Sequence, residues 1–328
     1  MLEPNRSDQK GSFMTEIERV LVTGGCGFIG ANLVRFLRDR TDWEVRVIDD
    51  LRTGSRGYIT DDLAEVMVGS VGDPAALEPA LEGIDAVVHL ASETGVAPSV
   101  ANPTKDFEGN SLTTFRTLES CRQRGVNRLV FASSGAAVGD VTPPIHEEVV
   151  PRPLSPYGAG KLVGEAYCQA YAGSFGMQTA ALRFSNVYGP FSAHKKNAVP
   201  NFIKRCLNGE PIEIFGDGSK TRDFIHVDDL SDAIVRALTT DGIAGEVFQL
   251  ATGIETSVLE LAGLVQSATG AANEVSFGEG LAGEVYKSRA DISKITKVLG
   301  FEPSIPLLEG LAQTASWYRE HWRPDAAA

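Results

Sequence analysis

The stretch TGGCGFIG, residues 23–30, decides the fold because of what stands on either side of it. The apolar run RVLV before it is typical of a buried strand, and FIGANLVRFLRDR continues from it with apolar residues at helical spacing. Gly24, Gly27 and Gly30 therefore fall in a turn between a strand and a helix. Such glycines let the backbone approach a pyrophosphate, and the helix N-terminus faces its charge. The stretch predicts a dinucleotide-binding site, with an ordinary glycine-rich turn as the alternative.

The next predicted strand, WEVRVIDD, ends on two aspartates. Asp49 lies where a carboxylate can bond both hydroxyls of an adenosine ribose. A carboxylate would repel a 2′-phosphate, so this position favours NAD over NADP. Asp50 is adjacent, and a solvated acidic loop is the alternative interpretation.

Short apolar runs alternate with stretches of helical spacing through the first half of the chain. Continuous apolar strands separated by helices are typical of a parallel sheet covered on both faces. We expect strands within residues 19–25, 43–50, 85–92, 126–134 and 177–190. We expect helices within residues 28–40, 74–83, 113–125 and 157–176. The chain is therefore predicted to form a doubly wound (Rossmann) α/β fold.

After Pro190 the alternation loosens, which predicts a smaller α/β substrate-binding C-terminal domain. Helices are expected within residues 199–210, 227–240, 257–270 and 291–300, and strands within 211–218 and 245–252. The chain should cross back to the first domain at least once. The predicted division is a nucleotide-binding domain of residues 14–186 and 217–250, a substrate domain of residues 187–216 and 251–324, and a disordered extension of residues 1–13.

Composition excludes several classes of function. The net charge of −13 over 328 residues, without a basic stripe, argues against nucleic-acid binding. No apolar run is long enough to span a bilayer, and the first residues lack an apolar signal core, so a cytoplasmic protein is expected. The five histidines form no ligand cluster, so no metal is expected, and His89 should be a packed core residue. Reduced, buried thiols are expected at Cys26, Cys121, Cys168 and Cys206.

The stretch SPYGAGK, residues 155–161, places a phenol and an ammonium four residues apart. Tyr157 and Lys161 would lie on one face of a helix, where the cation could lower the pKa of the phenol. Ser133 and Ser134 end the preceding strand, at the carboxyl edge where ligands bind. A serine, a tyrosine and a lysine are thus predicted to converge beside a nicotinamide; taken alone, the pair could be a surface coincidence.

Together these motifs resemble the extended short-chain dehydrogenase/reductase superfamily. Within it the chain is similar to the NAD-dependent nucleotide-sugar epimerase/dehydratase family, and closest to UDP-sugar 4-epimerases. The resemblance covers residues 18–320. It rests on TGGCGFIG, VIDDLRTG, VVHLAS, VFASSGAAVGD, SPYGAGK, LRFSNVYGP, GDGSKTRDFIHVDD and SRADISKITKVLGFEP, in that order.

The resemblance implies roles for individual residues. Tyr157 is similar to the catalytic base, Lys161 to the lysine that lowers its pKa, and Ser134 to the catalytic serine, with Ser133 as the fallback. The implied cofactor contacts are Gly24, Gly27, Phe28, Ile29, Gly30, Asp49, Asp50, Ser70, Val71, Leu90, Ala91, Ser92, Asn110, Tyr157 and Lys161. The implied substrate contacts are Thr94, Ser99, Ser134, Asn186, Asn197, Phe215, Arg222 and Glu284.

Alternatives remain for some of these residues. Arg222 could instead pair with Asp223 or Asp217, and Asn186 could only fix a turn. The stretch HKKN, residues 194–197, could be a solvated loop.

The chain departs from the family pattern at four places. Val138 replaces an aromatic residue, and Ser70 replaces an acidic residue that contacts adenine. Leu281 stands where relatives often carry a phosphate-binding arginine, and Glu284 stands for an aspartate. These departures put the grip on the nucleotide in doubt.

The residues after Ser134 bear on the reaction. By resemblance, dehydratases carry an Asp-Glu pair there and decarboxylases a glutamate, whereas this chain has Gly135 and Ala136, which cannot move a proton. The resemblance therefore implies an NAD-dependent 4-epimerase acting on a UDP-hexose or UDP-hexuronate through a 4-keto intermediate. A dehydratase, a decarboxylase, a 4-ketoreductase and a non-catalytic NAD-sensing regulator are the alternatives. The family usually forms homodimers through two helices, here those of residues 103–125 and 157–176.

Overall fold

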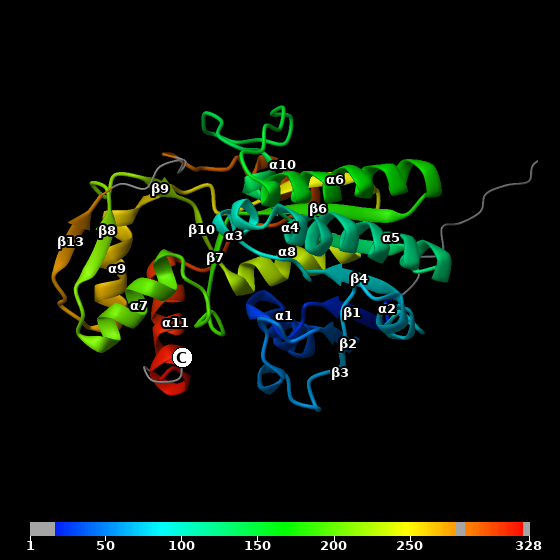
Figure 1. Cartoon of the computed structure of the whole chain (residues 1–328), viewed down its shortest axis with the longest axis horizontal. Helices are drawn as coiled ribbons and strands as arrows, with labels where there is room; N and C mark the ends of the chain where they lie inside the picture. The colour runs from blue at the N-terminus through cyan, green and yellow to red at the C-terminus, as the bar shows by residue number, and fades with distance from the viewer. Residues whose placement is uncertain (1–16, 280–285, 324–328) are drawn as a thin grey trace, which may run out of the picture.

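Seven parallel strands form the sheet on which the larger lobe is built (Figure 1). The computed structural model describes residues 17–279 and 286–323. The strand order is β11-β6-β5-β4-β1-β2-β3, so the direction of winding reverses between β1 and β4. The strands are β1 Arg19–Thr23, β2 Glu44–Asp49, β3 Glu65–Val68, β4 Ala86–His89, β5 Arg128–Ser134, β6 Gln178–Phe184 and β11 Glu246–Leu250. The predicted doubly wound parallel sheet is confirmed.

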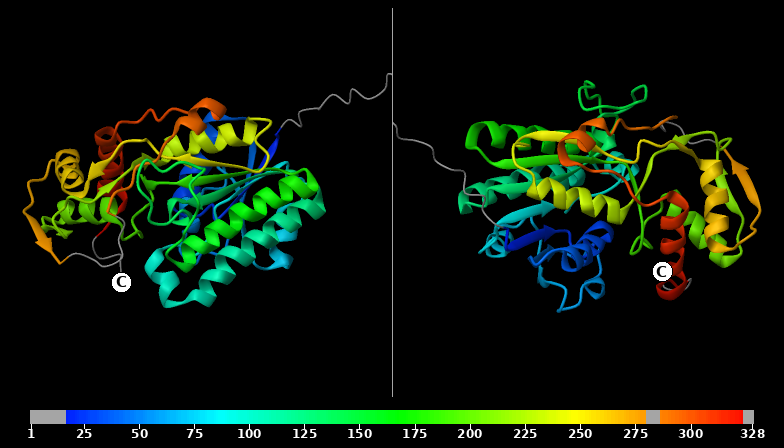
Figure 2. Two further views of the ribbon diagram at one scale, coloured as in Figure 1. Left: turned by 90° about the horizontal axis from the view of Figure 1, so that it is seen from above. Right: turned by 180° about the vertical axis from the view of Figure 1, so that it is seen from behind.

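Helices cover both faces of this sheet (Figure 2). One face carries α2 Pro74–Ala80, α5 Thr113–Arg124 and α6 Pro156–Phe175. The other face carries α1 Phe28–Arg40, α8 Val227–Thr239 and α10 Ser293–Leu299. Before α5 the chain forms α3 Val96–Ala101, α4 Pro103–Phe107 and a π-helical turn, η2 Glu108–Leu112; short 3-10 turns occur at η1 Arg56–Tyr58 and η3 Gly135–Ala137.

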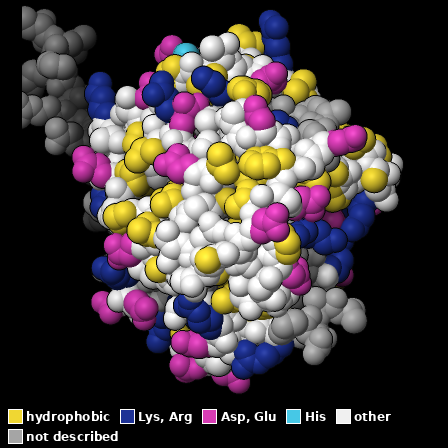
Figure 3. Space-filling view, turned by 90° about the vertical axis from the view of Figure 1, so that its left-hand side faces the viewer, with side chains coloured by type: hydrophobic (Ala, Val, Ile, Leu, Met, Phe, Trp, Pro, Cys, Tyr) yellow, Lys and Arg dark blue, Asp and Glu magenta, His cyan; other side chains and the backbone are white. Residues whose placement is uncertain are grey.

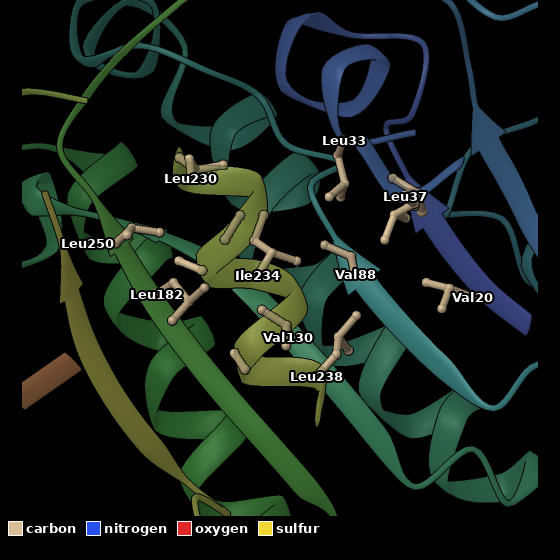
Figure 4. Close-up of a cluster of buried hydrophobic side chains, with 14 of the residues drawn as sticks. Val20, Leu33, Leu37, Val88, Val130, Leu182, Leu230, Ile234, Leu238 and Leu250 are labelled. Carbon is tan, nitrogen blue, oxygen red and sulfur yellow. The ribbon is translucent and has the colours of Figure 1, made fainter. Parts of the chain in front are cut away.

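A dry core fills the space between the sheet and the helices α1 and α8 (Figure 4). Its labelled side chains are fully buried, and each such leucine, isoleucine or valine contributes about 1.5–3 kcal/mol by leaving water. The strands contribute Val20, Val88, Val130, Leu182 and Leu250, and the helices contribute Leu33, Leu37, Leu230, Ile234 and Leu238. Because the strands are buried beneath helices, they appear in the sequence as continuous apolar runs.

The smaller lobe packs three helices against two short parallel strands (Figure 1). Its elements are α7 Ala198–Asn208, α9 Val258–Thr269, α11 Leu307–His321, β8 Ile212–Phe215 and β13 Val275–Gly278. Two further pairs link the lobes: β7 Asn186–Tyr188 with β10 Phe224–His226, and β9 Thr221–Arg222 with β12 Thr256–Ser257. On the outer end of this lobe, hydrophobic side chains lie in small groups among intermixed acidic and basic ones (Figure 3).

The chain returns to the larger lobe twice. β11 joins the sheet beside β6, which is the predicted crossing. The second return is α10, whose Ile295 and Leu299 belong to the core beneath the sheet. The sequence division placed residues 251–324 in the substrate domain, and a seven-residue helix gives no signal of which core it will join.

The predicted extension, residues 1–13, lies outside the described residues. Among the described helices, none is both long and apolar enough to cross a membrane.

Candidate active site

The glycine turn is shaped by close backbone contacts between β1 and α1. Gly24 has φ +70°, and a Cβ on it would lie 2.9 Å from the backbone nitrogen of Ala91. A Cβ on Gly30 would overlap the carbonyl of Gly24. The turn therefore tolerates no side chain at these two positions, and α1 begins with its free N–H groups directed at the crevice where the strand order reverses.

Asp49 ends β2 at the same edge of the sheet. Its carboxylate accepts hydrogen bonds from the backbone nitrogens of Cys26, at 2.9 Å, and Leu51, at 2.8 Å. Burial raises the pKa of Asp49, and the two hydrogen bonds oppose that rise. Asp50 points elsewhere, because its carboxylate pairs with Arg52 at 2.6 Å. Asp49 is thus fixed in place beside the glycine turn.

A cavity of about 390 Å³ runs along this edge. All the residues predicted to contact the cofactor line it except Asn110. They are Gly24, Gly27, Phe28, Ile29, Gly30, Asp49, Asp50, Ser70, Val71, Leu90, Ala91, Ser92, Tyr157 and Lys161. A glycine turn at a helix N-terminus and a buried carboxylate on the neighbouring strand are the donor and acceptor set that suits a pyrophosphate and a ribose. The residues present therefore fit NAD.

A second cavity, of about 1390 Å³, lies on the far side of α1, between that helix, residues 190–194 and α11. Neither Tyr157 nor Lys161 lines it. The smaller cavity is therefore the candidate active site, since it holds the groups that can carry chemistry.

Helix α6 brings the tyrosine and the lysine to this cavity. Its N-terminus is capped by Ser155, whose hydroxyl accepts a hydrogen bond from the backbone nitrogen of Gly158 at 3.1 Å. The ammonium of Lys161 donates to the carbonyl of Ala132, at 2.8 Å, and lies 5.8 Å from the centre of the Tyr157 ring. The Ser134 side chain lies close enough to the Tyr157 phenol to lower its pKa. The structure thus brings the three predicted catalytic residues together.

The serine doublet at the end of β5 is divided between two tasks. Ser133 forms part of the cavity wall, but its hydroxyl donates to the buried carboxylate of Glu165. Glu165 in turn accepts two 2.8 Å hydrogen bonds from Arg183 on β6. Successive strand residues point to opposite sides, so Ser134 faces Tyr157 instead. This geometry favours Ser134 over the fallback Ser133.

The pKa values of the two titrating groups differ from the simple expectation. Burial raises the pKa of Tyr157, the hydrogen bond from Ser134 lowers it, and the charge of Asp106 raises it further. The pKa of Tyr157 is thus raised by burial, whereas the spacing of Tyr157 and Lys161 predicts that it is lowered. Burial lowers the pKa of Lys161 to about 8, and the Asp106 carboxylate opposes that change. His89 is a core residue as expected, with its pKa lowered by burial to about 3.

Asp106 is a functional candidate that the sequence analysis missed. It is buried on α4, and its carboxylate accepts a 2.8 Å hydrogen bond from Asn110. Asn110 also donates to the carbonyl of Glu93 and accepts from the hydroxyl of Ser92 at 2.6 Å. Asn110 therefore holds the cavity wall from behind and does not line the cavity as predicted. The four-residue spacing of Asp106 and Asn110 was the available signal.

The predicted substrate residues are spread over two lobes. Thr94 lines the cavity, whereas Ser99 is buried beside a small adjoining cavity and donates to the carbonyl of Val96. Ser134 lies beside Tyr157. The other described residues of this set do not line the cofactor cavity; they are Asn186, Asn197, Phe215 and Arg222. Glu284 and Leu281 lie outside the described residues.

Two of these residues had structural alternatives. Asn186 donates to the carbonyl of Asp223, at 3.2 Å, across the β7–β10 pair. Both carboxylates suggested as partners for Arg222 accept other hydrogen bonds: Asp223 from the backbone nitrogens of Thr252 and Gly253, and Asp217 from Ser219. Val138, at the position where an aromatic residue was expected, is fully buried.

Comparison with known proteins identifies the class. Residues 20–251 match the model of the NAD dependent epimerase/dehydratase family. The UDP-glucose 4-epimerase of Mycolicibacterium smegmatis is 37% identical to the chain over 316 residues, which are 92% of this chain and 98% of that protein. The chain belongs to the NAD dependent epimerase/dehydratase family. This membership confirms the family resemblance and NAD as the cofactor.

Solved structures agree with this assignment. A structure of Thermotoga maritima UDP-glucose 4-epimerase with UDP-glucose matches with a TM-score of 0.87 and 34% identity, covering 92% of this chain and 99% of that one. A structure of Bacillus cereus UDP-glucuronic acid 4-epimerase with UDP-glucuronic acid and NAD matches with a TM-score of 0.85 and 30% identity, again covering 92% and 99%.

The serine doublet gives a first prediction. Ser134→Ala removes the hydroxyl bonded to Tyr157 and should lower turnover by roughly 10²-fold or more, with stability nearly unchanged. Ser133→Ala leaves the buried Glu165 with one donor fewer and should lower the free energy of unfolding by about 1–2 kcal/mol, with a smaller effect on turnover. Steady-state kinetics and chemical denaturation of both variants check this. The reverse pattern would show that Ser133 faces the substrate.

The charge of Asp106 gives a second prediction, on pH dependence. Asp106 raises the pKa of both Tyr157 and Lys161, so Asp106→Asn should lower both. Turnover requires Tyr157 as the phenolate, which sets the rising limb of the pH–rate profile, and Lys161 as the ammonium, which sets the falling limb. Both limbs should therefore move to lower pH. The exposed, distant Asp42→Asn is the matched control and should leave the profile in place. A profile unmoved in Asp106→Asn, or moved to higher pH, contradicts this electrostatic role.

Proposed function

We propose that the protein is an NAD-dependent nucleotide-sugar 4-epimerase acting on a UDP-hexose or UDP-hexuronate. The observation that carries this proposal is that Tyr157 and Lys161 line the cofactor cavity, with Ser134 beside Tyr157. Support also comes from the UDP-sugar epimerases among the relatives.

Each residue of this group has a separate task. Tyr157 takes the proton of the sugar C4 hydroxyl when C4 is oxidised and returns it when C4 is reduced. Ser134 bonds the same oxygen and holds it beside the phenol. Lys161, whose ammonium lies 5.8 Å from the centre of the Tyr157 ring, is assigned the task of stabilising the phenolate during proton transfer. NAD supplies the hydride acceptor and donor for the two half-reactions. The 4-keto sugar must turn over between them to present its other face.

The residues after Ser134 support epimerisation over elimination. Gly135 and Ala136 begin a 3-10 turn, and the backbone nitrogen of Ala136 donates to the Ser134 hydroxyl at 3.2 Å. Neither residue carries a group that could protonate C6 or remove the C5 hydrogen. Loss of water or carbon dioxide from the sugar therefore has no acid or base at this position.

The smaller lobe supplies the candidate contacts to the nucleotide. Asn186, Asn197, Phe215 and Arg222 lie on its segments β7, the start of α7, β8 and β9. An arginine fork suits phosphate oxygens, and an amide suits either phosphate or uracil. We infer that the UDP group lies on this lobe while the sugar reaches Tyr157.

Product analysis is the test of this function. The protein, incubated separately with UDP-glucose, UDP-N-acetylglucosamine and UDP-glucuronate, should yield the C4 epimer of at least one of them with unchanged mass. A product lighter by one water or one carbon dioxide would establish a dehydratase or a decarboxylase. Consumption of added cofactor in each cycle would establish a 4-ketoreductase or dehydrogenase.

Tyr157→Phe should retain bound NAD and lose turnover by roughly 10²- to 10⁴-fold, because it deletes the proton-transferring hydroxyl. Tyr167→Phe removes a hydroxyl from the exposed side of the same helix and should be active. Kinetics and the NAD content of the purified variants check both statements. A parent protein that binds NAD but converts none of the three sugars would favour the non-catalytic regulator.

We further propose that the protein is a cytoplasmic homodimer joined through α5 and α6. Phe115 and Tyr167 are more than one-third exposed on these helices, and their rings touch with centroids 5.4 Å apart. The cytoplasmic location is supported by four free, buried cysteines, which suit a reducing compartment.

Tyr167→Glu should convert the dimer to a monomer by placing an unpaired charge in the dimer interface. Phe277→Glu, at a more exposed aromatic on β13 of the smaller lobe, is the control and should leave the dimer intact. Sedimentation velocity distinguishes the two states. A parent protein that sediments as a monomer rules the dimer out.

A further inference from the structure

A lysine from the smaller lobe reaches the wall of the active-site cavity. Lys195 follows the turn at residues 189–192, and its ammonium donates to the hydroxyl of Thr94 on the larger lobe, at 3.3 Å. Both residues line the cavity that contains Tyr157 and Lys161. The stretch HKKN is therefore more than a solvated loop, since one of its lysines is part of the site.

Among the described residues, no acid forms an ion pair with Lys195. The other cations of the cavity wall have carboxylates at hand: Arg52 pairs with Asp50 and Glu93, Lys105 pairs with Glu93 at 3.1 Å, and Lys161 is influenced by Asp106. Within residues 17–279 and 286–323, no carboxylate oxygen lies within 4.0 Å of the Lys195 ammonium.

The neighbours of Lys195 do not compensate its charge. Burial first, and then the charges of Lys195 and Lys204, lower the pKa of the adjacent His194 to about 4, so this imidazole is neutral at pH 7. Burial lowers the pKa of Lys195 itself, so an ammonium here costs free energy that an anionic partner would offset. In a chain with a net charge of −13, an uncompensated cation in the cavity wall indicates an anionic ligand group.

The strand order indicates which part of the ligand this is. Thr94 follows β4, which pairs with β5, and Ser134 stands at the end of β5. Asp49, which marks the adenosine end, lies at the end of β2, two strands from β4. Thr94, and Lys195 with it, therefore lies nearer to the Ser134 end of the cavity than Asp49 does. The anionic group of a sugar that lies nearest to C4 is a carboxylate at C6.

We propose that Lys195, together with the Thr94 hydroxyl, binds the C6 carboxylate of a nucleotide hexuronate and makes such a sugar the preferred substrate. The proposal rests on the proposed nucleotide-sugar function. An ammonium and a hydroxyl 3.3 Å apart present two donors, which match the two oxygens of one carboxylate. A neutral hexose offers only a hydroxyl there and leaves the cation without a partner. The lysine thus discriminates by charge next to the reacting carbon.

Equilibrium binding tests this without depending on turnover. NAD-loaded Tyr157→Phe protein is titrated with UDP-glucuronate and with UDP-glucose, which differ only at C6. The same titrations are repeated with the double variant that carries Tyr157→Phe and Lys195→Gln. The matched control adds Lys196→Gln, which removes the same charge from the adjacent, exposed lysine.

The protein should bind UDP-glucuronate at least about tenfold more tightly than UDP-glucose. Lys195→Gln should weaken UDP-glucuronate binding by roughly tenfold to a hundredfold, the loss of one charge-assisted hydrogen bond, and change UDP-glucose binding by less than about threefold. Lys196→Gln should keep the preference. Retained UDP-glucose binding shows that the variant is folded.

Each other outcome overturns the proposal. Equal losses for both sugars would assign Lys195 to the diphosphate, and loss of bound NAD would assign it to the cofactor. No preference in the parent protein, or no effect of Lys195→Gln, would leave the lysine without a ligand role. Failure of the proposed epimerase activity is seen separately, as no epimer formed by the protein with intact Tyr157.

Discussion

The buried ion pair between Glu165 and Arg183 fixes the geometry on which the site depends. Tyr157, Lys161 and Glu165 are spaced four residues apart and share one face of α6. Glu165 is bound by Arg183 from β6 and by Ser133 from β5, so the rotation of the helix over the sheet is set. Removing one partner from such a pair typically costs about 3–5 kcal/mol, which makes this rotation hard to change. Tyr157 and Lys161, which lie nearer the N-terminus of α6, are thereby held over the carboxyl edge of the sheet.

The two lobes divide the recognition of ligands between them. The reversal of strand order between β1 and β4 opens a crevice for a dinucleotide, with a glycine turn at one side and Asp49 at the other. The smaller lobe returns to this crevice through the segment that carries Lys195. Its remaining candidate contacts lie away from the cavity, as expected if the nucleotide sugar bridges the lobes. On the proposed function, the cofactor and the sugar meet beside Tyr157.

Much of the fold, and part of the site, could be read from the sequence. Apolar periodicity located the sheet strands apart from β3, a four-residue edge strand with Val68 exposed. The four-residue spacing of Tyr157 and Lys161 placed them on one helix face, but sequence could not choose between Ser133 and Ser134, because that depends on the partner Glu165 across the sheet. Asp106 was missed, and Lys195 was considered only within a possible solvated loop, because the effect of Asp106 on Lys161 and the contact of Lys195 with Thr94 join distant segments. The direction of the Tyr157 pKa shift depends on burial, which spacing does not reveal.

Convergence of Ser134, Tyr157 and Lys161 beside the cofactor cavity implies that C4 is oxidised and reduced within one binding event. Conversion of UDP-glucuronate and UDP-glucose in heavy water, with mass and magnetic resonance analysis of the epimer, measures this directly. The epimer should carry no deuterium at C4, because the C4 hydrogen returns without passing through the solvent. Deuterium at C4 of the epimer would contradict transient oxidation at C4 with direct return of that hydrogen and would require a different reaction.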